Sequence, residues 1–144
     1  YEKSKDPQVK KNSASEIASY YATVLENPES ARIWWEKVDQ GGTSQEEIAA
    51  VYELAKMDGA VGKTDNAIQR LESLVARPVP KNTQWFVLVH YQLAALYHTL
   101  EQFPNALQHY QEVAEHPEVK GLEQYRDLSN KTALQIEAYL AQLQ

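Results

Sequence analysis

A pattern of one small and one large residue recurs three times along the chain, and it restricts the possible folds more than any other feature. In each copy an alanine is followed four positions later by a large apolar side chain, and the alanines are 36 and 39 residues apart. Residues four apart share one side of an α-helix, so a small residue beside a large one lets two helices cross closely. Repeats of this length are typical of stacked helical hairpins. The pairs are Ala31 and Trp35, Ala67 and Leu71, and Ala106 and Tyr110.

Signals for helix ends fall between the copies of this pattern. Ser13 and Ser44 each precede a glutamate by three positions, which is the capping-box pattern at a helix start. Asn27, Asp65 and Thr83 are further predicted N-caps, and Asn27 is followed by proline at the first helical position. We predict seven helices joined by short loops, over residues 13–26, 28–39, 45–58, 64–77, 83–100, 104–115 and 121–142.

The third copy carries most of a known repeat motif. It reads His90-x2-Leu93-Ala94-x2-Tyr97, then Ala106-x3-Tyr110, and closes with Pro117. The second copy keeps part of the motif but has Asp58 where the motif has tyrosine, and the first copy keeps little beyond Ala31 and Trp35. Over about residues 12 to 118 the chain resembles a tetratricopeptide-repeat (TPR) array. The resemblance implies an all-α protein, an α-solenoid of about three antiparallel helix hairpins with a C-terminal capping helix.

The stretch Gly62-Lys63-Thr64 matches the end of a phosphate-binding loop, but its surroundings argue against nucleotide binding. That loop needs a glycine five residues before Gly62, where this chain has Met57, and it should follow a β-strand. The residues before Gly62 have helical spacing. We predict a turn between two helices, in which Gly62 supplies a backbone conformation that other residues adopt at a cost. Glu26 and Glu101 occupy the same place in the other copies.

Composition excludes several classes of function. The net charge is −6, and a lysine-bearing segment at residues 1–12 leaves the rest more acidic still, which argues against nucleic-acid binding. There is no cysteine, which excludes disulfides, zinc–thiolate sites and a thiol nucleophile. Residues 82–100 contain no charged side chain but include histidine and glutamine, so we expect a buried helix and not a membrane span.

We divide the chain into a flexible linker or tail at residues 1–12 and a TPR-like domain at residues 13–144. The tail is expected to be a solvated linker, with a membrane-surface or acidic-partner role left open. Because the chain begins at Tyr1 without methionine, we expect it to be a piece of a longer protein. It would be a soluble domain, either cytoplasmic or an extracytoplasmic portion of a membrane-anchored parent.

The histidines do not have the spacing of a helical metal site. His90, His98, His109 and His116 include no pair four residues apart, and no arrangement resembling a catalytic triad can be singled out. We therefore expect no catalytic residue, no metal and no cofactor. His90 replaces the tryptophan of the repeat motif and is expected in the core, whereas His98 is expected on the concave side.

The resemblance implies that the first helix of each hairpin lines a concave groove. We expect the groove to bind a peptide or helix of another protein, as a scaffold or adaptor module. At the positions that TPR co-chaperones use to bind a C-terminal carboxylate, this chain has no lysine, arginine or asparagine; the corresponding residues are Glu16, Tyr20, Glu53, Leu88 and Gln92. Self-association and a non-catalytic accessory role in an enzyme or secretion machine remain alternatives. The predicted groove residues are Glu16, Tyr20, Tyr52, Glu53, Lys56, Leu88, Tyr91, Gln92 and His98.

Overall fold

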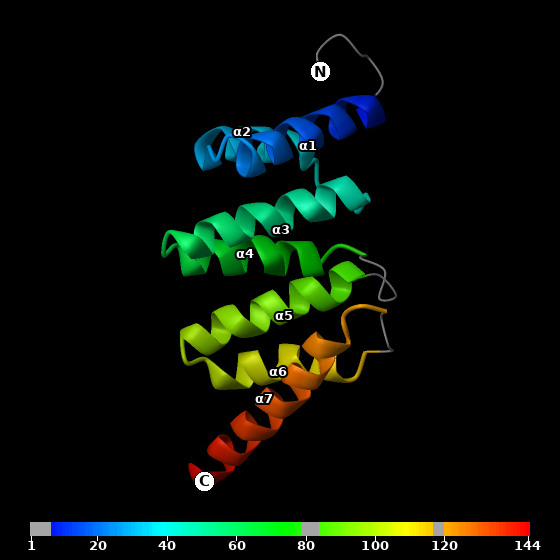
Figure 1. Cartoon of the computed structure of the whole chain (residues 1–144). Coiled ribbons are helices and arrows are strands. Elements are labelled where there is room, and N and C mark those ends of the chain that lie inside the picture. The colour runs from blue at the N-terminus through cyan, green and yellow to red at the C-terminus, as the bar shows by residue number, and fades with distance from the viewer. Residues whose placement is uncertain (1–6, 79–83, 117–119) are drawn as a thin grey trace. The chain divides into compact units, whose positions relative to one another are not determined.

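The computed structural model describes residues 7–78, 84–116 and 120–144, with side chains from residue 14 onward. This part of the chain is all-α, as predicted, and contains no β-strand (Figure 1). It falls into two compact units, residues 1–78 with α1 to α4 and residues 79–144 with α5 to α7. The helices are α1 Pro7–Thr23, α2 Pro28–Val38, α3 Gln45–Ala60, α4 Thr64–Val75, α5 Gln84–Thr99, α6 Phe103–Ala114 and α7 Glu123–Gln142.

The predicted helix bounds hold within two residues for α2 to α7, but α1 begins earlier than expected. It starts at Pro7, so residues 7–12 are helix and not flexible tail, and Ser13 is not an N-cap. Residues 8–13 contain no glycine or proline, and proline is favoured in the first helical turn, so nothing delays the helix until Ser13. Residues 1–6 of the predicted tail lie outside the described residues.

Two of the predicted N-caps, Asn27 and Ser44, are confirmed, and Asp65 is wrong, as Ser13 is. The Asn27 side chain accepts a hydrogen bond from the backbone N–H of Ser30, and the Ser44 hydroxyl accepts one from Glu47. The helix α4 begins at Thr64, with Lys63 at the N-cap and no side-chain cap bond. Asp65 therefore lies in the first turn, where the helix dipole favours a carboxylate. Thr83 lies outside the described residues.

In unit 1, α1 packs against α2, α3 packs against α4, and α2 joins the two pairs by packing on α3. Ala31 and Ala67 are fully buried, as the repeat pattern predicts. The adjacent tryptophans differ, because Trp35 is in the core and Trp34 lies beside it with Lys37 over its ring. Such a difference follows from the 100° rotation between neighbouring helical residues.

In unit 2, α6 packs against both α5 and α7. Ala106 is fully buried and Tyr110 nearly so, and both belong to one cluster with Ala94, Ala133 and Ile136. Residues of α7 thus complete the core beneath the α5–α6 hairpin. The terminal helix covers apolar surface that this hairpin would otherwise expose.

The turn between α3 and α4 explains the glycine-lysine sequence. Gly62 has a φ of 83°, in the left-handed region that glycine reaches without steric cost. Its N–H donates to the carbonyl of Gly59 at 3.2 Å, and the next N–H, of Lys63, donates to the carbonyl of Asp58 at 2.8 Å. This is the Schellman arrangement that closes a helix.

The turn between α5 and α6 has the same hydrogen bonds around a glutamate. Glu101 has a φ of 57°, and its N–H donates to His98 O while the N–H of Gln102 donates to Tyr97 O. Glu26, in the first copy, has a φ of 48°. The three left-handed residues are thus 36 and 39 positions apart, the spacing of the alanine repeat.

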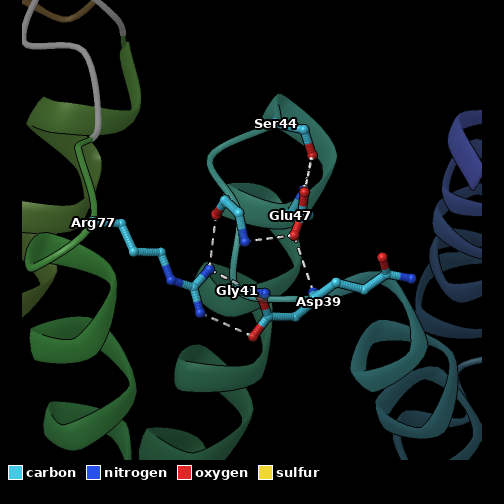
Figure 2. A network of polar contacts seen from close by, with 7 residues as sticks. Asp39, Gly41, Ser44, Glu47 and Arg77 are labelled. Atoms are coloured by element: carbon cyan, nitrogen blue, oxygen red, sulfur yellow. Dashed lines mark hydrogen bonds and ion pairs between the residues drawn. The ribbon is translucent and has the colours of Figure 1, made fainter.

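A polar network fixes the loop between α2 and α3 to the end of α4 (Figure 2). The buried carboxylate of Glu47 accepts hydrogen bonds from the backbone of Gln40 and Gly42 and from the Ser44 hydroxyl, at 3.0, 2.8 and 2.8 Å. A Cβ at Gly42 would lie 2.6 Å from Glu47 Oε1, so a larger residue there would displace the end of the Glu47 side chain. Arg77 donates to both carboxylate oxygens of Asp39 and to the carbonyl of Gly42.

Candidate functional site

In unit 1 the predicted groove residues lie on α1 and α3, and most keep contact with solvent. Glu16 and Tyr20 are exposed on α1, with Tyr20 at 51% of its full accessibility. On α3, Lys56 lies over the Tyr52 ring, 5.4 Å from its centroid, and 3.8 Å from the Glu53 carboxylate. One exposed cation thus contacts an aromatic ring and an acid on the same helix face.

In unit 2 the predicted residues Tyr91 and His98 belong to a continuous series of aromatic rings, which we call the aromatic ladder. Each ring meets the next edge to face, with centroids 5.1 to 6.0 Å apart. Such geometry brings the positive edge of one ring to the negative face of its neighbour. The order is Tyr125 of α7, Tyr91 of α5, Tyr110 of α6, His98 of α5, Phe103 of α6 and Tyr139 of α7.

His98 connects the core to the exposed end of the ladder. Its Nδ1 lies 3.1 Å from the hydroxyl oxygen of Tyr110. Burial, together with the nearby Tyr91, raises the pKa of the Tyr110 hydroxyl to about 12, so this group is protonated at neutral pH. When Tyr110 donates to Nδ1, neutral His98 carries its hydrogen on Nε2, because the bond at one ring nitrogen sets the tautomer. Nε2 is then a hydrogen-bond donor.

A hollow opens beside His98, at the end of the ladder. Its volume is about 200 Å³, and its lining is more apolar than polar. His98 and Phe103 form the wall at the α5–α6 turn, and α7 forms the opposite wall. Ile136 is buried whereas Tyr139 is 46% exposed, so the hollow extends from the core of unit 2 to its surface. The residues contributed by α7 are Thr132, Gln135, Ile136 and Tyr139.

The structure shows which predicted residues lie together. Tyr52, Glu53 and Lys56 form one contacting group, and Tyr91 and His98 meet through Tyr110. Leu88 and Gln92 are half-buried on α5 and are not members of the aromatic ladder. Tyr91 also packs on the unit 2 core, so it contributes to stability as well as to the surface.

Sequence reasoning missed the residues that α6 and α7 contribute: Phe103, Tyr125, Ile136 and Tyr139. A signal for two of them was present. Tyr125 and Tyr139 are 14 positions apart, close to four helical turns, which places both on one face of α7. No such spacing points to Phe103, because its contacts with His98 and Tyr139 depend on how α5, α6 and α7 pack.

The charged cluster around Asp58 has a structural explanation. Asp58 is buried on α3, and its two carboxylate oxygens accept hydrogen bonds from Arg32 of α2 at 2.8 Å and Arg70 of α4 at 2.7 Å. Burial alone would raise the pKa of this carboxyl, but the two hydrogen bonds and the positive charges of the arginines outweigh it and lower the pKa. Asp58 is therefore ionised and paired, and it joins three helices of unit 1.

A group of buried histidines lies in unit 2, and His90 is in the core as predicted. His90 Nδ1 and His109 Nδ1 are 2.9 Å apart, and His116 stacks on Phe86. These rings fill the space between α5 and α6. Among the described residues, no three His, Asp or Glu side chains are placed to hold a metal ion.

Comparisons of the chain with protein-family models, with curated proteins and with solved structures found no match. Across residues 7–78, 84–116 and 120–144, no helix is both long and apolar enough to cross a membrane.

Proposed function

We propose that this chain is a protein–protein interaction module that acts as a scaffold or adaptor and has no catalytic site of its own. The observation that carries the proposal is the aromatic ladder. Its central ring, Tyr110, is buried, but the rings on either side reach the surface of unit 2 on α5 and α7. Tyrosine and other aromatic side chains are favoured at interfaces because they offer rigid apolar area and a polar group at low entropic cost.

The low charge of the helix faces that carry the ladder also supports a protein partner. The helix α5 contains no Asp, Glu, Lys or Arg. On α7 the charged side chains lie at the sides and back of the ladder face by helical spacing, and Glu137 accepts a hydrogen bond from Gln111 on α6. A surface of this kind suits an apolar stripe of a peptide or helix better than a nucleic acid.

The TPR-like architecture is part of the same proposal. Three left-handed turn residues recur in step with three buried alanines, and each turn connects two packed helices. Arrays of such hairpins present the first helix of each pair on a concave side. In unit 1 the first helices would be α1 and α3, and in unit 2 the first helix would be α5.

Self-association is the second candidate, and exposed apolar residues on α7 favour it. Leu128, Leu134 and Leu143 are 48, 58 and 66% exposed. A second copy packed on this helix would remove them from water. A role as an accessory domain of an enzyme or secretion machine would use the same surfaces, with the partner as the larger assembly.

Affinity capture from an extract of the source cells tests the main proposal. A Tyr20→Ala and Lys56→Ala double variant addresses unit 1, and a His98→Ala variant addresses unit 2. We expect at least one variant to lose a partner that the original chain retains, while its circular dichroism spectrum shows that the helices are kept. Sedimentation over a concentration series tests self-association. Capture of the same proteins by the original chain and both variants, with no self-association, would contradict an interaction role for these surfaces.

A further inference from the structure

The hollow at the end of the aromatic ladder has the size of a site for one side chain. An apolar cavity of roughly 150 Å³ binds benzene, whereas sites for drug-sized ligands measure about 300–1,000 Å³. At about 200 Å³, the hollow between His98, Phe103 and α7 falls close to the first value. Its size therefore favours a single aromatic or large aliphatic group over a nucleotide or an organic cofactor.

The lining of the hollow indicates how a peptide would be held there. Ile136 and Phe103 offer apolar contact, and the edge-to-face pairing of Phe103 with Tyr139, 5.2 Å between centroids, orients the outer ring. Thr132, Gln135 and His98 place a hydroxyl, an amide and an imidazole around the same space. These groups can hydrogen-bond to the backbone of an extended peptide whose side chain enters the hollow.

The charges near the hollow indicate the neighbouring residue of that peptide. Glu101 is exposed in the α5–α6 turn, two residues before Phe103, and its backbone N–H is bonded to His98 O. Glu101 therefore lies in the turn between two lining residues of the hollow, His98 and Phe103. The described residues of unit 2 carry six carboxylate side chains against the cations of Lys120, Arg126 and Lys131. A basic group in the partner suits this side of unit 2.

We propose that this hollow is an anchor pocket for one large apolar side chain of a partner protein, with a lysine or arginine of the partner next to it, against Glu101. The inference rests on the proposed interaction function and specifies where and what unit 2 binds. The pocket confers affinity through burial of the anchor, as central pockets commonly do at interfaces. Glu101 contributes selectivity by favouring a basic neighbour over an acidic one.

Selection of linear peptides from a random display library on the immobilised whole chain tests this assignment. We expect an enriched motif with one Leu, Met, Phe or Trp and a Lys or Arg within a few positions of it. A fluorescently labelled synthetic copy of the enriched peptide then measures affinity by anisotropy. Tyr139→Ala removes the outer wall of the pocket and should weaken binding by about tenfold or more, equivalent to about 1.4 kcal/mol.

Two further variants make the test specific. Asn130→Ala is the matched control, since Asn130 is exposed on the opposite side of α7 from Tyr139, and it should leave the affinity unchanged. Gln135→Trp places a ring across the opening and should block the peptide without removing any wall. Circular dichroism and the melting temperature of each variant show whether the helices are retained, because α7 contributes to the unit 2 core.

Selection on Glu101→Lys should exchange the basic neighbour for Asp or Glu and keep the apolar anchor. Equal binding by Tyr139→Ala, Gln135→Trp and the original chain would overturn the pocket. No enriched motif, or one that is acidic on the original chain, would do the same. Selected peptides whose binding depends on Tyr20 or Lys56 would contradict the pocket but not the interaction function. The interaction function itself is tested by the capture experiment.

Discussion

The hairpin α3–α4 in unit 1 and the hairpin α5–α6 in unit 2 close with the same turn but make different contacts behind it. At equivalent positions of the repeat, α3 has Asp58 and α5 has Tyr97, and each turn returns a backbone N–H to the carbonyl of that residue. Asp58 pairs with Arg70, which is three residues after Ala67. Tyr97 stacks on His109, three residues after Ala106, with ring planes 5° apart.

The comparison indicates that the position of Asp58 and Tyr97 does not need a tyrosine. It needs a side chain that matches its partner on the second helix of the hairpin. Aspartate with arginine and tyrosine with histidine both join the two helices of a hairpin. In the first copy the same positions hold Ala22 and Trp34, which both pack on the unit 1 core. A charged pair, a stacked pair and a combination of a small with a large residue thus stand at matching sequence positions within a single chain.

Removal of Asp58 is expected to have the largest effect, because it breaks the charged version of the pair. Asp58→Ala leaves Arg32 and Arg70 without their shared carboxylate, although each arginine is about a third exposed. Loss of one partner from a buried ion pair costs about 3–5 kcal/mol, and solvation of the two arginines favours the lower end of that range. Urea unfolding, followed by tryptophan fluorescence, gives the change.

Asp65→Ala is the control, since Asp65 is exposed in the first turn of α4 and the loss of its interaction with the helix dipole costs about 0.3–1 kcal/mol. Native-state hydrogen exchange locates the loss. It should fall on α2, α3 and α4. A change of less than about 1 kcal/mol for Asp58→Ala would mean that the network contributes no more than a surface ion pair.

The two units should also respond to opposite extremes of pH. The pKa of Asp58 is lowered in the folded chain, so its stabilisation is present above the ordinary value of 3.8 and is lost as the pH falls below it. The pKa of Tyr110 is raised from 10 to about 12, so its stabilisation is present below pH 10 and is lost as the pH rises toward 12. Two pKa units correspond to about 2–3 kcal/mol for Tyr110.

Residue-resolved hydrogen exchange or NMR across pH separates these two effects. Acid should open unit 1 in the original chain, and Asp58→Asn should remove part of that dependence. Alkali should open unit 2, and Tyr110→Phe should remove the corresponding part. Ultraviolet absorbance of the Tyr110 phenolate, obtained by difference from Tyr110→Phe, should appear only near pH 12 while the chain is folded. Ionisation of Tyr110 near pH 10 in the folded chain would contradict its burial.

Transplanting the stacked pair into unit 1 tests whether the pair is the unit of stability. Asp58→Tyr and Arg70→His should each destabilise the chain when made alone, because each leaves a mismatched partner. Together they should cost less than the sum of the single changes, with a coupling of about 1 kcal/mol or more. A double-mutant cycle measured by urea unfolding gives this coupling. Simple additivity would show that the two positions do not act together.

The turns allow a smaller comparison, because one left-handed position holds glycine and the other holds glutamate. Gly62→Ala should destabilise unit 1 by about 1 kcal/mol, since a side chain is strained at positive φ. Glu101→Gly should stabilise unit 2 by roughly 0.5–1 kcal/mol by removing that strain. Thermal unfolding of both variants gives the two signs. The same sign for both would show that the turns differ in a way their hydrogen bonds do not reveal.

These comparisons also show what the sequence could and could not predict. The repeat spacing, most helix bounds and the special role of Gly62 follow from local rules, and the structure confirms them. The sequence shows that Asp58 replaces the tyrosine of the motif. Arg70 lies on the second helix of the same hairpin, at the repeat position that His109 occupies in the third copy. Asp58 also pairs with Arg32 of α2, and no local rule connects these two residues.

The candidate site was only partly predictable for the same reason. The positions on α5 follow from the repeat, so Tyr91 and His98 were found. The hollow also needs Phe103 from the start of α6 and Tyr139 from α7, and these meet only through the packing of three helices. The start of α1 at Pro7 was missed because Ser13 and Glu16 match the capping-box pattern although they lie inside the helix. Residues 8–13 contain no helix breaker, so the helix continues through them.

The smallest expected effect concerns Lys63, the residue that makes the turn resemble a phosphate-binding loop. Lys63 is exposed at the N-cap of α4, and its side chain makes no cap hydrogen bond. Its backbone N–H makes the hydrogen bond to Asp58 O that closes the turn, and alanine keeps this N–H. Lys63→Ala should therefore change the free energy of unfolding by no more than about 0.5 kcal/mol. Neither the original chain nor the variant should bind ATP or GTP in calorimetry, because a helix precedes Gly62 where a phosphate loop follows a strand. Nucleotide binding that disappears in Lys63→Ala would show instead that the lysine contacts phosphate from a helical turn. In that case the turn with Lys63 would be the functional part of this hairpin. The pair of Asp58, five residues earlier, and Arg70 would then be only structural.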